Sequence, residues 1–128
     1  MKTEPLSLGG ETVAKQNKEG NGLSELKAAI RSLEPARLYV FHGEEMFLLH
    51  HYLGQLKNAV VDELTESFNY HRFTNETFDL QSFADAVENL PMMAERTLVQ
   101  VDDIDVFKLG EDDRSKMLDI LSDIPDYC

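Results

Sequence analysis

Three aspartates occupy positions at which a nucleotide-binding α/β protein would have its magnesium ligands. Asp102, Asp103 and Asp105 follow an apolar, β-prone run at residues 97–101, and such folds usually place a magnesium-binding carboxylate after a strand. Magnesium is generally held by carboxylates together with substrate phosphates, so this assignment requires a phosphate site nearby. The competing interpretation is an acidic turn on the protein surface.

The turn after the first expected strand has the wrong charge for a phosphate site. Such a turn is normally glycine-rich and carries Lys and Ser or Thr, because backbone N–H groups and an ammonium hold the phosphates. Here Gly43 is followed by Glu44 and Glu45, and like charges a few ångströms apart repel by about 1 to 4 kcal/mol at effective dielectric constants of roughly 80 to 20. We interpret these three residues as a degenerate phosphate loop. On this interpretation the acids after residue 101 form an acidic turn on the surface. The alternative function is a magnesium-dependent, nucleotide-binding phosphoryl-transfer domain that uses Asp102 and Asp103.

Other patterns typical of catalysis or metal binding are missing from the sequence. The histidines form no His-Glu-x-x-His pair, and the single cysteine, Cys128, completes neither a zinc set nor an internal disulfide. No Gly-x-Ser-x-Gly turn offers a nucleophilic serine. We therefore expect no metal, no cofactor and no catalysis from this chain.

The composition argues against direct binding to nucleic acid or to a membrane. The 24 Asp and Glu residues against 12 Lys and Arg give a net charge of −12, which opposes the phosphate neutralisation that supplies most non-specific nucleic-acid affinity. We expect contact with DNA to be indirect. No apolar run approaches the roughly 20 residues of a membrane helix, and residues 1–10 lack the apolar block of a secretory signal. A cytoplasmic protein fits these features.

Seven elements in the order α-β-α-β-α-β-α are expected to position these residues. Residues 1–22 contain four glycines among polar residues and show no helical or strand period, which predicts a flexible polar arm. We expect residues 23–128 to form one domain, with Asp79 as the N-cap of its third helix. Apolar stripes predict helices over 23–33, 44–64, 79–87 and 117–124, and β-prone runs predict strands over 38–41, 68–73 and 97–101.

The alternation of strands and helices predicts the fold class. Helices of this length between strands imply right-handed crossovers and a mainly parallel sheet covered on both faces. We therefore expect an α/β, three-layer, P-loop-like domain. The chain ends where a fourth strand is expected, so the sheet is predicted to be truncated before its later strands.

Two adjacent methionines occupy the segment between the third helix and the third strand. The segment reads Leu90, Pro91, Met92 and Met93, and the proline fixes the angle at which the chain leaves the helix. Methionine is flexible and polarisable, and it is common at surfaces that must fit a hydrophobic groove. A methionine pair is, however, more often buried in a core. The residues alone leave both interpretations open.

Three blocks of sequence resemble the delta subunits of bacterial DNA polymerase III clamp loaders. They are residues 38–48, 68–73 and 90–99, and their order and spacing together are fairly specific. The resemblance covers residues 23 to about 126. It implies the amino-terminal domain of a clamp-loader branch of the AAA+ fold that has no working phosphate loop, in agreement with the acidic turn described above.

The resemblance also implies a function and a contact site. In this family the segment after the third helix inserts a hydrophobic pair into a pocket on the sliding clamp, and the matching residues here are Met92 and Met93, with Leu90 beside them. Such a subunit binds and helps open the DNA sliding clamp during replication without hydrolysing ATP itself. The implied partners are the beta sliding clamp and, through the full-length protein, the tau/gamma and delta prime subunits of the polymerase III holoenzyme.

Overall fold

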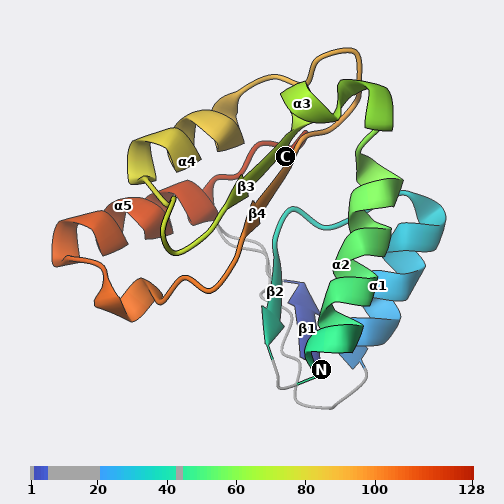
Figure 1. The fold of residues 1–128 in the computed structure, drawn as a ribbon, viewed down its shortest axis with the longest axis horizontal. Coiled ribbons are helices and arrows are strands. Elements are labelled where there is room, and N and C mark those ends of the chain that lie inside the picture. The colour runs from blue at the N-terminus through green and yellow to red at the C-terminus, as the bar shows by residue number, and fades with distance from the viewer. Residues whose placement is uncertain (1, 6–20, 43–44) are drawn as a thin grey trace. The chain divides into compact units, whose positions relative to one another are not determined.

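The computed structural model describes residues 2–5, 21–42 and 45–128 and contains the predicted alternation of helices and strands. Figure 1 shows the elements in chain order, from blue at the N-terminus to red at the C-terminus. They form two compact units, Met1–Val60 and Val61–Cys128, each with buried apolar side chains of its own. None of the helices in this described part of the chain is long and apolar enough to cross a membrane.

The first unit combines two helices with a pair of strands. Helix α1 packs against α2 and against strand β1. Leu26 of α1 and Leu56 of α2 are buried, as their helical spacing with neighbouring apolar residues predicted. The elements are β1 (Lys2–Pro5), α1 (Asn21–Ser32), β2 (Tyr39–His42) and α2 (Met46–Val60).

The pairing of β1 with β2 differs from the prediction. The sequence predicted no regular element in residues 1–22, yet Lys2–Pro5 pair antiparallel with β2 and place Lys2 opposite His42. Strand pairing is made by backbone N–H and C=O groups, which every non-proline residue carries, so a short polar strand leaves no side-chain signal. That residues 1–22 are a flexible arm stays a prediction.

Two leucines expected on buried helical stripes are exposed in the structure. Leu33 lies just beyond α1 with a φ of 58°, the left-handed conformation in which helices often end. Leu64 lies beyond α2, because the Asp62 carboxylate accepts a hydrogen bond of 2.8 Å from the Leu64 N–H and starts a separate short turn. Local side-chain capping therefore ends the long helix earlier than its apolar period indicated.

The second unit holds a small parallel sheet. Strands β3 and β4 pair in parallel with Tyr70 opposite Leu98, and helix α4 connects them. This β-α-β unit confirms the mixed α/β class and the parallel pairing of these two strands. Its elements are η1 (Glu63–Thr65), α3 (Glu66–Asn69), β3 (Tyr70–Phe73), α4 (Leu80–Glu88), β4 (Leu98–Val101), η2 (Val106–Lys108) and α5 (Glu111–Ser122).

Each sheet in the described residues has fewer strands than the sequence predicted. Within the described residues the strands form two separate pairs, β1 with β2 and β3 with β4. The parallel pairing that the sequence predicted is seen for β3 with β4, whereas the partner of β2 is the antiparallel strand β1. The three-layer, P-loop-like architecture and its later strands stay predictions.

An aromatic cluster joins the sheet to α4. The rings of Phe73, Phe78 and Phe83 have centroids 5.6 to 6.1 Å apart, a separation at which aromatic pairs attract beyond simple burial. Helix α4 also packs against β4 and α5, and in Figure 1 α4 and α5 lie side by side. The predicted cap is confirmed, since the Asp79 carboxylate accepts a 2.9 Å hydrogen bond from the Ser82 N–H.

Truncating the buried aromatic ring should destabilise the protein strongly. Phe83 is buried, so we expect Phe83→Ala to lower the free energy of unfolding by about 3 to 5 kcal/mol. Phe107→Ala is the matched control, because that ring is 84% exposed and exposed substitutions change stability by only about 0.5 kcal/mol. Urea unfolding followed by circular dichroism measures both, and equal effects would contradict the assigned core.

The cap of α4 predicts a pH-dependent contribution to stability. Hydrogen bonds from the Ser82 backbone and hydroxyl lower the pKa of Asp79, so its contribution is present above the unfolded pKa of about 3.9 and is lost as pH falls through the folded pKa. We expect Asp79→Ala to lower the thermal midpoint by roughly 4 to 8 °C at neutral pH and by much less below the folded pKa.

Asp79→Asn is the control for this effect, because asparagine caps helices about as well as aspartate but does not titrate. Scanning calorimetry measures the thermal midpoint of each variant at neutral and at strongly acidic pH. At neutral pH the midpoint of Asp79→Asn should lie near that of the wild type. A difference between wild type and Asp79→Ala that is the same at both pH values would contradict the cap's titration.

Candidate functional site

The loop between α4 and β4 carries three exposed apolar side chains. Leu90, Met92 and Met93 have exposed fractions of 72%, 51% and 93%, and we call these three residues the methionine tip. Helix α4 ends at its C-cap Asn89, and Pro91 then prevents the chain from continuing as a helix. The interpretation of the methionine pair as core is therefore wrong, and the surface interpretation holds.

A buried asparagine holds the main chain of the tip. The Asn69 side chain is fully buried; its Oδ1 accepts a 2.7 Å hydrogen bond from the Met92 N–H, and its Nδ2 donates to the Met92 carbonyl at 2.8 Å. Nδ2 also donates to the Thr65 Oγ1 at 3.0 Å. In Figure 1 the loop that follows α4 passes beside α3, which ends at Asn69.

The residue after this contact has a strained backbone. Met93 has a φ of 55°, a left-handed conformation that costs a residue with a side chain roughly 1 to 2 kcal/mol. Such conformations persist where surrounding contacts fix the chain, and the two hydrogen bonds at Met92 are such contacts. Met93, the more exposed of the two methionines, therefore follows a residue whose backbone is held by Asn69.

Other apolar side chains near this anchoring point are exposed as well. Leu64 of η1 and Phe68 of α3 are exposed, and each directly precedes a residue of the hydrogen-bonded pair Thr65 and Asn69. Exposed apolar side chains often mark a protein contact surface where they form a contiguous patch. The second unit therefore exposes apolar side chains on η1 and α3 as well as on the tip.

Sequence reasoning missed Asn69 and Thr65. Residues 68–73 were expected to form one strand, but Phe68 and Asn69 belong to α3 and only Tyr70–Phe73 form β3. A signal was present, because asparagine is depleted in strands and buried polar side chains are usually hydrogen-bonded. The bonding partner, 23 residues further along the chain, had no local signal.

The predicted degenerate phosphate loop lies largely outside the described residues. Of its three residues, Gly43 and Glu44 are not described, and Glu45 is exposed directly before α2. The backbone carbonyl of Glu45 accepts the hydrogen bond of the Leu49 N–H, so its backbone begins the first turn of the helix. The loss of phosphate binding at this turn stays a prediction.

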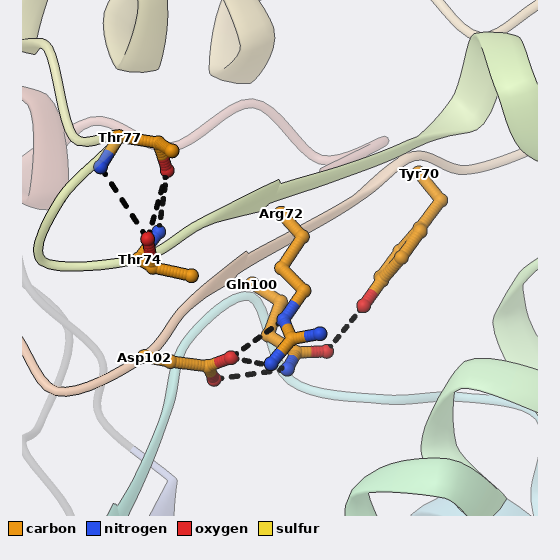
Figure 2. A network of polar contacts seen from close by, with 6 residues as sticks. All are labelled: Tyr70, Arg72, Thr74, Thr77, Gln100 and Asp102. Atoms are coloured by element: carbon orange, nitrogen blue, oxygen red, sulfur yellow. Dashed lines mark hydrogen bonds and ion pairs between the residues drawn. The ribbon is translucent and has the colours of Figure 1, made fainter.

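Asp102 is held in a polar network on one face of the parallel sheet (Figure 2). Its carboxylate accepts a 2.7 Å hydrogen bond from Arg72 Nε, which is also an ion pair, and a 2.9 Å bond from the Gln100 amide. The Gln100 Oε1 accepts from the Tyr70 hydroxyl at 2.6 Å. The hydrogen bond and charge of Asp102 raise the pKa of Arg72. Asp102 therefore already has a cationic partner.

The other two acids of the turn, Asp103 and Asp105, have local structural explanations. Asp105 caps η2, where its carboxylate accepts a 3.0 Å hydrogen bond from the Phe107 N–H. Asp103 is exposed with a φ of 56°, a conformation that aspartate adopts more readily than most residues. Among the residues that the structure describes, no three His, Cys, Asp or Glu side chains are placed to hold a metal ion.

Comparison with known proteins assigns the chain to a family. A family model described as DNA polymerase III, delta subunit, matches residues 39–128. The chain belongs to this family. The match spans α2, the whole second unit and the methionine tip, and it confirms the resemblance found in the sequence.

A curated sequence and a solved structure from Bacillus subtilis are similar to the chain. The DNA polymerase III subunit delta of strain 168 is 35% identical over 91 residues, which are 70% of this chain and 26% of that protein. The solved structure of the DNA clamp loader delta protein is 29% identical with a TM-score of 0.61, and the likeness again covers 70% of this chain and 26% of that one. The chain thus spans about a quarter of the length of these family members.

The network around Asp102 predicts the outcome of a nucleotide titration. We expect no saturable binding of magnesium-ATP at micromolar concentrations, because Arg72 and Gln100 already occupy the Asp102 carboxylate. Isothermal titration calorimetry checks this, with Asp102→Asn as the matched variant. Binding by the wild type that Asp102→Asn removes would favour the phosphoryl-transfer alternative.

Proposed function

We propose that this chain is the clamp-contacting part of a clamp-loader delta subunit, and that it binds the DNA sliding clamp through Met92 and Met93, with Leu90 beside them. The observation that carries the proposal is the exposure of these three apolar side chains on a backbone fixed by a buried asparagine. Membership of the delta subunit family supports the sliding clamp as the partner.

Burial of the tip in an apolar pocket supplies the affinity. Transfer of a methionine side chain from water to an apolar site contributes roughly 1.5 to 3 kcal/mol, and Met93 has nearly all of its surface available for burial. Part of this gain offsets the loss of translational and rotational freedom on association. Because the Met92 backbone is already held, little further ordering of the main chain is required.

Clamp opening follows from a difference in affinity. A bound protein shifts the clamp towards an open ring only as far as it binds the open form better than the closed one. The tip is joined to the sheet in two ways, since β4 begins at Leu98 soon after Met93, and Asn69 directly precedes β3. A force on the tip is therefore transmitted to the β3–β4 sheet. In this proposal the tip and the sheet move together, and their better fit to the open clamp than to the closed one favours the open ring.

The chain opens the clamp without hydrolysing ATP. Its Asp102 is paired with Arg72, and the sequence directly before α2 has glutamates at 44 and 45, where the phosphate loop of a nucleotide-binding protein carries positive charge. The energy of nucleotide binding then comes from other loader subunits. Contacts with the tau/gamma and delta prime subunits belong to the full-length protein.

Contact with DNA is indirect in this proposal. The net charge of −12 repels the phosphate backbone and disfavours the counterion release that drives most non-specific binding. The clamp and the other loader subunits hold the DNA instead. The same acidic surface favours solubility and discourages association with nucleic acid during assembly.

Replacing both methionines should remove clamp binding. We expect Met92→Ala with Met93→Ala to weaken the affinity for the cognate sliding clamp by about 100-fold or more, since two buried methionines contribute at least roughly 3 kcal/mol. The thermal unfolding midpoint should change little, because both side chains are exposed. Surface plasmon resonance with immobilised clamp measures the affinity.

Phe107→Ala is the control for this substitution. Phe107 is another largely exposed apolar residue of the same unit, but it lies in η2, after β4 rather than before it. Its loss should leave the affinity unchanged. A methionine variant that binds the clamp as tightly as the wild type would show that the tip is not the contact site.

A further inference from the structure

The contact between Asn69 and Met92 satisfies both polar groups of one peptide residue with one side chain. The Asn69 amide accepts from the Met92 N–H at 2.7 Å and donates to the Met92 C=O at 2.8 Å. Asparagine is suited to this pattern because its amide carries both an acceptor oxygen and donor hydrogens. Aspartate offers no donor when ionised, and an apolar side chain offers neither group.

A chain of hydrogen bonds fixes the orientation of that amide. The Asn69 Nδ2 also donates to the Thr65 Oγ1 at 3.0 Å, and the Thr65 hydroxyl lies 3.4 Å from the Asp62 carbonyl to which it donates. The amide nitrogen therefore faces both Thr65 and the Met92 carbonyl, and the oxygen faces the Met92 N–H. Rotation of the amide by half a turn would break both of its hydrogen bonds to Met92, since an N–H would then face an N–H and an oxygen an oxygen.

The position of this contact ties it to the exposed tip. Met92 is half exposed and Met93 is almost fully exposed, so apolar packing does little to hold either residue in the free protein. Met93 has a left-handed backbone with a φ of 55°. Two hydrogen bonds from a fully buried side chain thus maintain a strained, solvent-facing conformation.

We propose that Asn69 is a positioning residue for clamp binding, which acts by holding the Met92 backbone so that Met93 projects in its bound conformation. The inference rests on the proposed function and adds a residue that does not itself touch the clamp. A preorganised contact residue raises affinity because less conformational freedom is lost on binding. Thr65 supports this role by orienting the Asn69 amide.

A double-mutant cycle separates positioning from general structural support. We expect Asn69→Ala to weaken clamp binding roughly tenfold in the wild-type background, which is about 1.4 kcal/mol. With Met93→Ala already present, the same change should have an effect of less than about threefold, because the side chain that it positions is absent. A purely structural role would give the same factor in both backgrounds, and that result would overturn the proposal.

Two further measurements test the mechanism in the same proteins. Hydrogen exchange of the Met92 amide should accelerate in Asn69→Ala, because that N–H loses its partner. Asn75→Ala is the matched control, since Asn75 is exposed in the turn after β3 and its loss should alter neither exchange at Met92 nor clamp affinity. Protection of Met92 that survives in Asn69→Ala would contradict the proposal.

Thr65→Val provides the test if Asn69→Ala does not fold. Valine has the shape of threonine without its hydroxyl, so it removes one of the three amide contacts and leaves the two bonds to Met92. Weaker clamp binding, by about threefold, with an unchanged unfolding midpoint supports the proposal. Unchanged affinity contradicts it.

The outcomes distinguish this inference from the proposed function. If neither the wild type nor any variant binds the cognate clamp, or if the double methionine variant binds normally, the proposed function fails. If the wild type binds and the methionine variant does not, while folded Asn69→Ala and Thr65→Val bind as tightly as the wild type, only the positioning role fails.

Discussion

The two hydrogen bonds between the Asn69 amide and the Met92 backbone are the constraint on which the candidate site depends. An exposed apolar loop gains almost nothing from burial, and an unrestrained backbone loses about 1 to 2 kcal/mol per residue of conformational entropy when it is ordered. Something polar must therefore hold it. A fully buried amide meets this need, because hydrogen bonds shielded from water are not exchanged easily for bonds to solvent.

The parallel sheet that carries this loop has two unlike faces. One side packs Phe73 against the aromatic residues Phe78 and Phe83, while the other carries the network of Tyr70, Arg72, Gln100 and Asp102 shown in Figure 2. The carboxylate that an ATP-handling protein would give to magnesium is here a partner of a guanidinium. Asp102 at the start of the acidic turn therefore contributes to the structure of the sheet.

Local patterns predicted most elements of the fold but little of their assembly. The stripe that includes Leu26 and the cap at Asp79 gave α1 and α4, because helix formation follows spacing and local hydrogen bonds. The strand Lys2–Pro5 was missed because backbone pairing leaves no side-chain pattern. Asn69 was missed for a related reason, since its partner Met92 is distant in sequence and only the folded chain brings them together. The tip itself was found through a family resemblance, and its exposure required the structure.

The tip combines a fixed backbone with adaptable side chains, and these properties have different uses. Methionine has three rotatable bonds and a polarisable sulfur, so Met92 and Met93 can fit a pocket of irregular shape. Such freedom alone would make binding costly, because side chain and backbone would both be ordered on contact. Fixing the Met92 backbone through Asn69 confines the conformational freedom to the side chains, which extend from a backbone of defined direction. A fixed backbone beneath adaptable side chains therefore combines a low entropy cost on contact with tolerance of the shape of the partner surface.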